Sequence, residues 1–274
     1  MSVDYNWNVF RYIADYLHLF GVITVLASLL WLRNCRGLSF KTQMFYLVIF
    51  CTRYLDLFGL MSAEGARHHS TYLILFKLFY IASAASIVGL MRTWSSTIET
   101  NKDTCSISGI LIPCLLLSVV SSVMNHQNYS FTRSCWIFSE ILEGFAMLPQ
   151  YIFNYRQDAE MKRRDNIGVL IFILAVGSYR MFYAANWIYK KAMMGASYTD
   201  YVSWFGGIVE IILFLDYLLN KSFLKLFVLG VDAKINDFTD IVEMKILNRP
   251  DSRRIPVDAT RIGAADDDEA MLII

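Results

Sequence analysis

The sequence predicts an all-helical integral membrane protein with seven transmembrane helices. Of its 274 residues, 56% are hydrophobic and only 18% are charged, whereas soluble domains carry about 25% charged residues. The mean hydropathy is +0.41. A helix needs about 20 apolar residues to cross a bilayer, and such stretches follow one another at short intervals. We place the seven spans at about 9–32, 43–61, 72–94, 107–124, 134–154, 167–189 and 202–220.

The two ends of the chain differ from this apolar region. The N-terminus, "MSVDYNWNVFRYIADY", lacks the basic region and the small-residue cleavage site of a signal peptide, so we expect the first span to act as its own signal. Residues 221–274 are polar, contain Pro250 and Pro256 and end in "ADDDEAMLII". We therefore predict a transmembrane domain over 1–220 and a largely disordered tail over 221–274.

Basic residues indicate the orientation of the spans. Loops on the cytosolic side of a membrane are enriched in Lys and Arg. The loops after the first and fifth spans are basic, whereas the loops on the opposite side carry fewer basic residues. We therefore place the N-terminus in the lumen and the C-terminus in the cytosol. Asn128 begins a glycosylation sequon on the lumenal side, so close to the membrane that we expect it to be unused. The cytosolic basic residues are Arg33, Arg36, Lys41, Arg156, Lys162, Arg163 and Arg164.

The usual signatures of an enzyme or a metal site are missing from the sequence. The five cysteines stand singly, without a CxxC pattern or a Cys/His spacing that would hold a metal. No Walker loop, GxSxG or HExxH motif occurs. We predict neither an enzyme nor a metal or cofactor site.

Ionisable residues within the spans are the most informative feature. Each costs at least about 2.5–3.5 kcal/mol at the centre of a membrane helix, so such groups are usually paired and functional. Arg11, Asp15 and His18 share one face of the first span because they are four and three residues apart. Arg53 and Asp56 lie about one turn apart in the second. Further ionisable or polar groups are Lys77, Glu143, Tyr179, Arg180, Tyr183, Asn186, Trp187, Glu210 and Asp216.

Several of these residues also have a purely structural interpretation. Arg11 lies near the lumenal end and can extend to the interface. His18 can be a hydrogen-bonded packing residue, and Lys77 can be structural. Asp216 can pair with Arg180 only to hold two helices together. Tyr183, Trp187 and Tyr189 can form an aromatic belt at the membrane boundary.

Arg53, Arg180 and Glu143 are harder to explain structurally, because they lie too deep to extend to the interface and come from three different spans. A polar cavity between the spans, open to the lumen, accounts for them. Arginines in its wall favour a ligand with a carboxylate, since the guanidinium group matches a carboxylate in two parallel hydrogen bonds.

Four stretches resemble a known family. "NVFRYIADYLHLFG", "TRYLDLF", "CWIFSEILEGFAMLPQ" and "YRMFYAANWIYKK" are similar to the corresponding stretches of the KDEL receptors, the ER lumen protein retaining receptors. The resemblance extends over about residues 8–220. It implies two three-helix repeats and a linker helix, similar to the SWEET and PQ-loop transporters. "GLSFKTQ" at 37–43 and "LPQ" at 148–150 mark the ends of corresponding helices, consistent with such a repeat.

The resemblance implies a receptor of the endoplasmic reticulum and Golgi membranes. Such a receptor binds escaped ER residents in the acidic Golgi by their C-terminal KDEL- or HDEL-like peptide. It returns them in coated vesicles by retrograde transport and releases them at neutral pH. A cytosolic tail recruits the coat, which places this contact near Lys221 and Lys225.

The resemblance also implies a role for individual residues. Arg53 and Tyr54 would bind the terminal carboxylate, and Arg11 the penultimate Glu. Trp187 and Lys190 would face the ligand Asp, with Tyr183 and Asn186 beside them. Trp136, within reach of Asp56, would stack near the fourth residue from the ligand's end. A proton-sensing and locking cluster would contain His18, Glu143, Tyr179, Arg180 and Asp216. Histidine suits this role because its ordinary pKa is about 6.5.

Three departures from the family pattern bear on specificity and trafficking. Arg133 stands where the family has a glutamate, and Lys190 where it has an arginine. Because Arg133 would repel a basic ligand residue, we predict a preference for tetrapeptides whose first residue is neutral or aromatic. The long acidic tail replaces a short lysine-bearing end. Its Asp268, Leu272 and Ile273 have the spacing of an acidic dileucine signal, a pattern that is common by chance.

Two alternatives stay open at the level of the sequence. A proton-coupled small-molecule transporter of the PQ-loop or SWEET type would share the fold. A divergent relative without a ligand would serve as a scaffold. The three arginines Arg11, Arg53 and Arg180 favour an anionic peptide end over a sugar.

Overall fold

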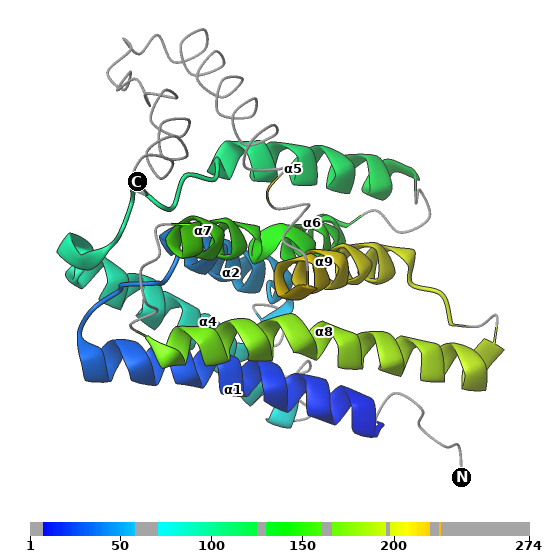
Figure 1. The fold of residues 1–274 in the computed structure, drawn as a ribbon. Helices are drawn as coiled ribbons and strands as arrows, with labels where there is room; N and C mark the ends of the chain where they lie inside the picture. The colour runs from blue at the N-terminus through cyan, green and yellow to red at the C-terminus, as the bar shows by residue number, and fades with distance from the viewer. Residues whose placement is uncertain are drawn as a thin grey trace, which may run out of the picture. The chain divides into compact units, whose positions relative to one another are not determined.

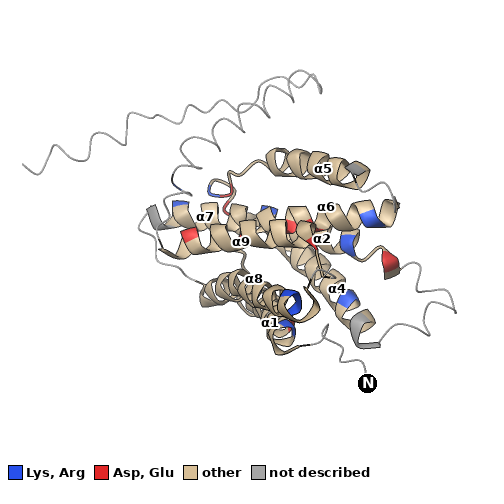
Figure 2. Cartoon of the chain, turned by 90° about the vertical axis from the view of Figure 1, so that its right-hand side faces the viewer, with Lys and Arg blue, Asp and Glu red and all other residues tan. Residues whose placement is uncertain are grey.

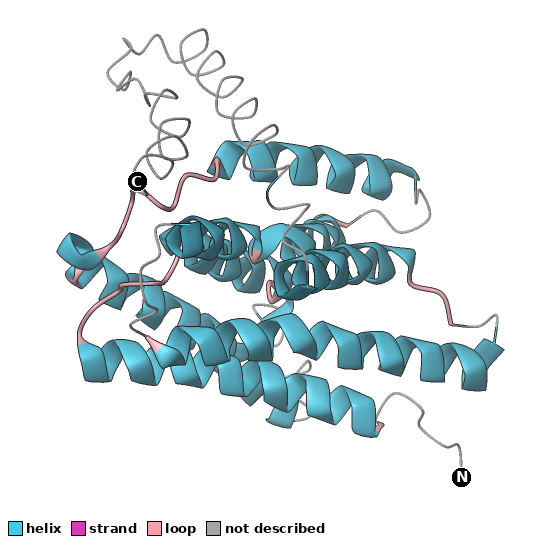
Figure 3. Cartoon of the chain, viewed as in Figure 1, coloured by secondary structure: helices cyan, strands magenta, loops and turns pink. Residues whose placement is uncertain are grey.

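The computed structural model describes residues 8–57, 71–124, 130–159, 166–195, 198–219 and 225 (Figure 1). Almost all of this part is helical, and no strand occurs in it (Figure 3). The described residues belong to the first of two units into which the chain divides, 1–236. The helices are α1 (Val9–Leu32), α2 (Phe40–Arg53), α4 (Thr71–Thr93), α5 (Ile107–Met124), α6 (Phe131–Ala146), α7 (Leu148–Ala159), α8 (Ile167–Met194) and α9 (Tyr201–Leu219), with a 3-10 turn at Ser95–Thr97.

The prediction of a helical membrane protein is confirmed. Four helices are long and apolar enough to cross a membrane: α1, the stretch Ile74–Thr93 of α4, α8 and α9. The shorter stretch Ile107–Val123 of α5 is also apolar, and α5 carries no charged residue (Figure 2). The predicted sequon at Asn128, the predicted contact at Lys221 and the tail from 226 onwards lie outside the described residues, while Lys225 is exposed.

Two predicted spans differ in their bounds. The span expected at 43–61 begins earlier, because Ser39 caps α2 by accepting a hydrogen bond from the backbone N–H of Thr42 at 3.2 Å. It ends in a turn after Arg53. The span expected at 134–154 is divided into α6 and α7 at Met147. Pro149 explains this break, because proline has no N–H to continue the hydrogen bonding of α6 and is tolerated in the first turn of α7.

Helix packing forms a closed sequence of neighbours. The most extensive contact joins α1 to α8, and the next joins α2 to α6. Both α1 and α2 also pack on α4, whereas α6 and α8 both pack on α9. Helix α5 packs on α6 (Figure 1). Polar side chains from these helices can therefore meet inside the bundle.

Asparagines fix the α1–α8 pair at both ends. Asn8 caps α1 by accepting a hydrogen bond from the backbone of Arg11 at 3.2 Å, and its Nδ2 donates to Asn186 Oδ1 at 2.6 Å. At the other end, Asn166 caps α8. Its Oδ1 accepts a hydrogen bond from the backbone N–H of Gly168 at 3.0 Å and another from Ser28 Oγ at 2.8 Å. Each cap thus also sets the register between the two helices.

Glycines bring α6 and α9 into backbone contact. A Cβ atom on Gly144 would lie 2.7 Å from the carbonyl oxygen of Gly206, and one on Gly206 would lie 2.4 Å from that of Glu140. Such distances exclude any larger residue, as in other close crossings of membrane helices. The crossing lies beside Glu140, Glu143 and Glu210, and so holds these acids near one another.

A neutral group of buried side chains joins the start of α2 to α7. Gln150 Oε1 accepts a hydrogen bond from Ser39 N at 2.8 Å, and the backbone N–H of Gln150 donates to Thr42 Oγ1 at 3.0 Å. Gln150 Nε2 donates to Gly37 O at 2.9 Å and to Asn154 Oδ1 at 3.0 Å. Asn154 Nδ2 donates to the Tyr217 hydroxyl at 3.1 Å. We call Ser39, Thr42, Gln150, Asn154 and Tyr217 the neutral junction.

Candidate ligand-binding site

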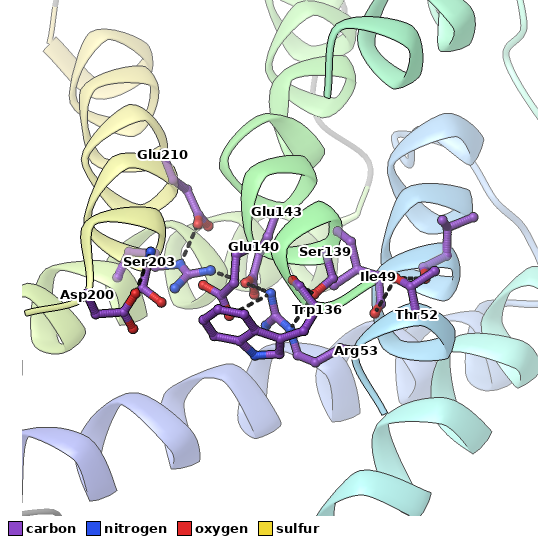
Figure 4. A network of polar contacts seen from close by, with 12 residues as sticks. Ile49, Thr52, Arg53, Trp136, Ser139, Glu140, Glu143, Asp200, Ser203 and Glu210 are labelled. Atoms are coloured by element: carbon purple, nitrogen blue, oxygen red, sulfur yellow. Dashed lines mark hydrogen bonds and ion pairs between the residues drawn. The ribbon is translucent and has the colours of Figure 1, made fainter. Parts of the chain in front are cut away.

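Five charged side chains from four helices meet inside the bundle. Arg53 comes from the end of α2, Glu140 and Glu143 from α6, Arg180 from α8 and Glu210 from α9. Figure 4 shows Arg53, the two α6 glutamates and Glu210 converging on one region. We call these five residues the charged cluster.

Arg53 is bound by three groups of α6. Its Nε donates to Ser139 Oγ at 3.1 Å, while its Nη2 lies 3.1 Å from Glu140 Oε1 and 2.6 Å from Glu143 Oε2 (Figure 4). Ser139 is held in turn, because its hydroxyl donates to the Trp136 carbonyl at 2.6 Å. One guanidinium group therefore faces two carboxylates.

Glu143 lies between the two arginines. Its Oε2 contacts the guanidinium groups of both Arg53 and Arg180, and its Oε1 accepts a hydrogen bond from the Tyr179 hydroxyl at 2.7 Å. Arg180 makes a second ion pair, in which its Nε donates to Glu210 Oε2 at 2.6 Å. The predicted grouping of Glu143, Tyr179 and Arg180 is present in this geometry.

Burial differs across the charged cluster. The side chains of Glu143 and Glu210 are 2% and 1% exposed, and that of Arg180 is 5% exposed. Arg53 and Glu140 are more accessible, at 14% and 10%. With all five groups ionised, the cluster carries two positive and three negative charges, a formal surplus of one negative charge. Buried charges are costly unless compensated, so the surplus favours the binding of one further positive charge, such as a proton.

His18 lies against this cluster. Its ring stacks on Tyr179 at 4.5 Å between centroids and on Tyr80 at 5.0 Å. Glu143, Arg180 and Arg53 are the charged groups that act on it. Among the described residues, His18 Nε2 is buried and has no hydrogen-bond partner. The Tyr179 ring thus stacks on the histidine while its hydroxyl donates to Glu143.

A second polar group lies nearer the start of α1. Arg11 Nε is 3.9 Å from Asp15 Oδ2, and the Tyr183 hydroxyl donates a short hydrogen bond to Asp15 Oδ1. Trp187 is buried in the space that Gly207 leaves, since a Cβ there would lie 2.2 Å from the indole. Lys190 is buried, and its Nζ lies 5.2 Å from the centroid of the Tyr198 ring. Asn186 is held by Asn8, as described above.

The remaining predicted ligand residues lie around the end of α2. Tyr54 stacks on Phe50 at 6.0 Å, and Lys77 Nζ lies 5.7 Å from its ring centroid. Lys77 also forms a short ion pair with Asp56, whose side chain is 48% exposed. Trp136 is half-buried one helical turn before Glu140, whereas Arg133 is exposed in the first turn of α6.

The acid that α9 contributes differs from the expected one. Asp216 was predicted for the locking cluster, but Arg180 pairs with Glu210. Asp216 lies six residues further along α9, a rise of about 9 Å. Sequence reasoning also missed Glu140, although its spacing of three residues from Glu143 places both on one helix face. Glu210 was recognised as an ionisable residue within a span and was given no role.

Comparison with known proteins agrees with the resemblance noted in the sequence. The sequence profile of the ER lumen protein retaining receptor family matches residues 34–190, which is more than half of the chain. The chain belongs to this receptor family. An ER lumen protein-retaining receptor of Drosophila melanogaster is 33% identical over 212 residues, which cover 77% of this chain and 91% of that protein. An ER lumen protein-retaining receptor of Petunia hybrida is 32% identical over 214 residues, which cover 77% of this chain and 91% of that protein.

A more distant source gives a similar match. The ER lumen protein-retaining receptor of Entamoeba histolytica is 29% identical over 212 residues, covering 77% of this chain and 91% of its own length. The region that matches the receptor-family profile contains Arg53, Glu140, Glu143 and Arg180, whereas His18 and Glu210 lie outside it. Most of the charged cluster therefore belongs to the part of the chain on which the receptor-family match rests.

Proposed function

We propose that this protein binds the C-terminal retention signal of escaped lumenal proteins, a KDEL- or HDEL-like peptide, in the acidic Golgi and returns them to the endoplasmic reticulum. Membership of the receptor family supports the general role. The observation that carries the proposal is Arg53, a partly accessible guanidinium group that already binds carboxylates. Such a group matches the terminal carboxylate that every peptide ligand carries.

The pH dependence follows from the charge of the cluster. A carboxylate ligand adds a negative charge to a region that already has one in surplus. Protonation of His18 removes the surplus, and Tyr179 and Glu143 connect the histidine to Arg53. Proton binding and ligand binding then strengthen each other, as linkage requires. The ligand binds in the acidic compartment and dissociates at neutral pH.

The other ligand residues have candidate partners in the same region. Arg11 suits the penultimate Glu of the signal, and its distance of 3.9 Å from Asp15 is long for an ion pair, so this contact can be exchanged. Trp187 and Lys190 suit the ligand Asp, with Tyr183 and Asn186 in the same helix. Trp136 would lie beside the fourth residue from the end, where Asp56 supplies a negative charge when it separates from Lys77.

The full architecture is part of the proposal. Seven spans arranged as two three-helix repeats and a linker would pair α1 with α6, α2 with α8, and α4 with α9 as equivalents. If each helix is replaced by its equivalent, every contact of the first repeat has an observed counterpart. The α1–α8 contact corresponds to α6–α2, the α1–α4 contact to α6–α9, and the α2–α4 contact to α8–α9. This correspondence supports the repeat, with α5 as the linker and residues 1–220 as the receptor domain.

The same proposal places the N-terminus in the lumen and the tail, 221–274, in the cytosol, where it would contact a vesicle coat. The positive-inside pattern of the loops supports this orientation. Nothing in the geometry of the described residues favours the transporter alternative, and the three relatives named above are receptors by name.

The test is peptide binding to the purified full chain in detergent. A fluorescent peptide ending in Asp-Glu-Leu is titrated at about pH 6 and about pH 7.5, values on either side of the ordinary pKa of histidine. We expect tighter binding at the lower pH, and weak binding of the same peptide with a C-terminal amide. Equal affinity for acid and amide at both pH values would contradict the proposal.

Specificity at the first ligand residue is a separate test. Arg133 is exposed, so its repulsion of a ligand Lys is screened and amounts to about 0–1 kcal/mol. We expect a peptide with a neutral first residue to bind at least as well as the lysine form, and Arg133→Glu to favour lysine by a few-fold. An unchanged order in Arg133→Glu would show that Arg133 does not reach the ligand.

A further inference from the structure

Arg53 has more hydrogen-bond acceptors around its Nε and Nη2 atoms than these two atoms can bind with good geometry. Its Nη2 is shared by Glu140 and Glu143, at 3.1 and 2.6 Å, and its Nε is taken by Ser139. Neither carboxylate forms the two parallel hydrogen bonds that are the strong geometry for arginine. These contacts occupy the edge of Arg53 formed by Nε and Nη2, so a ligand carboxylate can form two parallel hydrogen bonds with that edge only if a partner leaves.

The two glutamates are held very differently. Glu143 has three partners, Arg53, Arg180 and Tyr179, and its side chain is 2% exposed. Within the part of the chain that the structure describes, Glu140 has Arg53 as its one ion-pair partner, at the longer distance, and its side chain is 10% exposed. Glu140 is therefore the carboxylate that can leave at the lower cost.

From this contrast, and resting on the function proposed above, we infer that Glu140 is an internal competitor for the ligand. Its carboxylate occupies the position on Arg53 that the terminal carboxylate of the peptide takes, so that ligand capture exchanges one carboxylate for another. Glu140 then lowers the affinity of the empty receptor for the peptide carboxylate and prevents Arg53 from binding unrelated anions.

Charged groups from two other helices act on Glu140. They are Arg53 from α2 and Arg180 from α8, while Glu143 lies one turn further along α6 and Arg180 also pairs with Glu210 from α9. Helix α5, which packs on the other side of α6, has no ionisable acid or base among Asp, Glu, Lys and Arg. When a ligand displaces the Glu140 carboxylate from Arg53, that carboxylate loses its ion-pair partner beside Glu143 on the same helix. The exchange is therefore favourable only for a ligand that binds Arg53 more strongly than Glu140 does.

The decisive experiment uses isosteric variants of the full-length protein. Glu140→Gln removes the competing charge and keeps the side-chain shape. Glu210→Gln is the matched control, because it removes the same charge from the same charged cluster but from the partner of Arg180. Each protein is titrated at about pH 7.5, where histidine is mostly neutral, with a tetrapeptide that carries either a free C-terminal carboxylate or a C-terminal amide.

We expect Glu140→Gln to bind the free-acid peptide roughly tenfold more tightly than the wild type, the order of one charge-assisted hydrogen bond, and to bind the amide unchanged. Glu210→Gln removes the same surplus charge without releasing Arg53, so any rise in its acid-to-amide ratio should be clearly smaller than that of Glu140→Gln. The inference is overturned if Glu140→Gln binds the acid no better, if acid and amide gain equally, or if Glu210→Gln gives the same rise.

A second measurement does not depend on peptide recognition. Glu140→Ala and Glu210→Ala each open a space opposite an arginine, and thermal unfolding is followed with sodium acetate or with sodium chloride at the same ionic strength. Acetate should raise the unfolding temperature of Glu140→Ala above the effect of chloride. It should act clearly less on the wild type and on Glu210→Ala, because the Glu210 and Arg180 side chains are only 1% and 5% exposed. If no peptide binds any of the proteins, the proposed receptor function fails. The acetate result then decides the inference alone, and an equal response of all three proteins overturns it.

Discussion

The neutral junction and the charged cluster both bury polar side chains between α2 and the α6–α7 segment, yet they satisfy those side chains in different ways. In the neutral junction, each polar group of the Gln150 side chain has a partner with ordinary hydrogen-bond geometry. The charged cluster differs in this respect: three of its atoms, Arg53 Nη2, Glu143 Oε2 and Arg180 Nη2, lie at ion-pair distance without hydrogen-bond alignment. Within the described part of the chain, Glu210 Oε1 has no hydrogen-bond partner.

This difference indicates which region is fixed and which can change. A fully satisfied neutral network has one favoured arrangement, because breaking any bond leaves a buried group without a partner. A cluster with two cations and three anions has several arrangements of similar energy, and a proton or a carboxylate selects among them. We interpret the neutral junction as a fixed part of the scaffold and the charged cluster as the responsive site. Near the junction, Gln43 is an exception, since its Nε2 is buried without a partner.

The largest expected effect tests the charged cluster as a structural unit. Arg180→Met keeps the length of the side chain but leaves Glu143 and Glu210 short of positive charge. We expect a loss of about 3–5 kcal/mol in the free energy of unfolding, the usual cost of breaking a buried ion pair. Denaturant titration in mixed micelles measures it. Adding Glu210→Gln to the same protein should recover part of the loss, and a loss that the second substitution deepens would contradict the pairing.

The next effect concerns ligand capture. Arg53→Ala should weaken binding of the free-acid peptide by about 2–5 kcal/mol, because a partly desolvated carboxylate loses its partner. Thr52→Ala is the control, since the neighbouring Thr52 hydroxyl donates only to the carbonyls of Val48 and Ile49. Fluorescence titration at acidic pH reports both. If Arg53→Ala keeps its affinity within about threefold, less than the loss of one such partner allows, the carboxylate binds elsewhere.

A smaller effect concerns the pH dependence of peptide affinity, which should depend on the charged cluster and not on the neutral junction. His18→Phe keeps the ring that stacks on Tyr179 and Tyr80 and removes the proton-binding nitrogens. The wild type should lose up to about tenfold in affinity per pH unit as the pH rises, the limit for one linked proton. In His18→Phe the slope should be nearly flat. A slope that His18→Phe leaves unchanged would assign the proton to one of the glutamates of the charged cluster.

The smallest effect belongs to the neutral junction. Tyr217→Phe removes the acceptor of Asn154 Nδ2 and keeps the stacking of the ring on Tyr151 at 4.9 Å. We expect a loss of about 1 kcal/mol in stability, with little dependence on pH between about 6 and 7.5, because the lost hydrogen bond joins two uncharged side chains. A change in the pH dependence of peptide binding in this variant would show that the two regions are coupled.

The sequence predicted the helical membrane class well, because apolar length is a direct signal. It also grouped Arg53, Glu143 and Arg180, since charged groups buried in membrane helices need one another, whereas Tyr179 and His18 were added to them only by the family resemblance. It did not give the bounds of α2 or the division between α6 and α7. These depend on the Ser39 cap and on Pro149, which a count of apolar residues ignores.

The partners within the charged cluster were harder to predict. Which acid of α9 meets Arg180 depends on the rotation of α9 about its axis, and the Gly144–Gly206 crossing sets that rotation. Residue spacing alone therefore could not predict that Arg180 pairs with Glu210 and not with Asp216. The neutral junction was only half recognised: "GLSFKTQ" and "LPQ" were noted as helix ends, but uncharged side chains give no sign that they meet.

If the charged cluster couples a proton to a carboxylate, ligand binding must be accompanied by proton uptake. Titration calorimetry of the free-acid peptide at about pH 7 in two buffers of different ionisation enthalpy gives the number of protons taken up per peptide bound. We expect a net uptake of about one proton with the free acid, and clearly less with the amide. No uptake, or a release of protons, with the free-acid peptide would contradict this coupling.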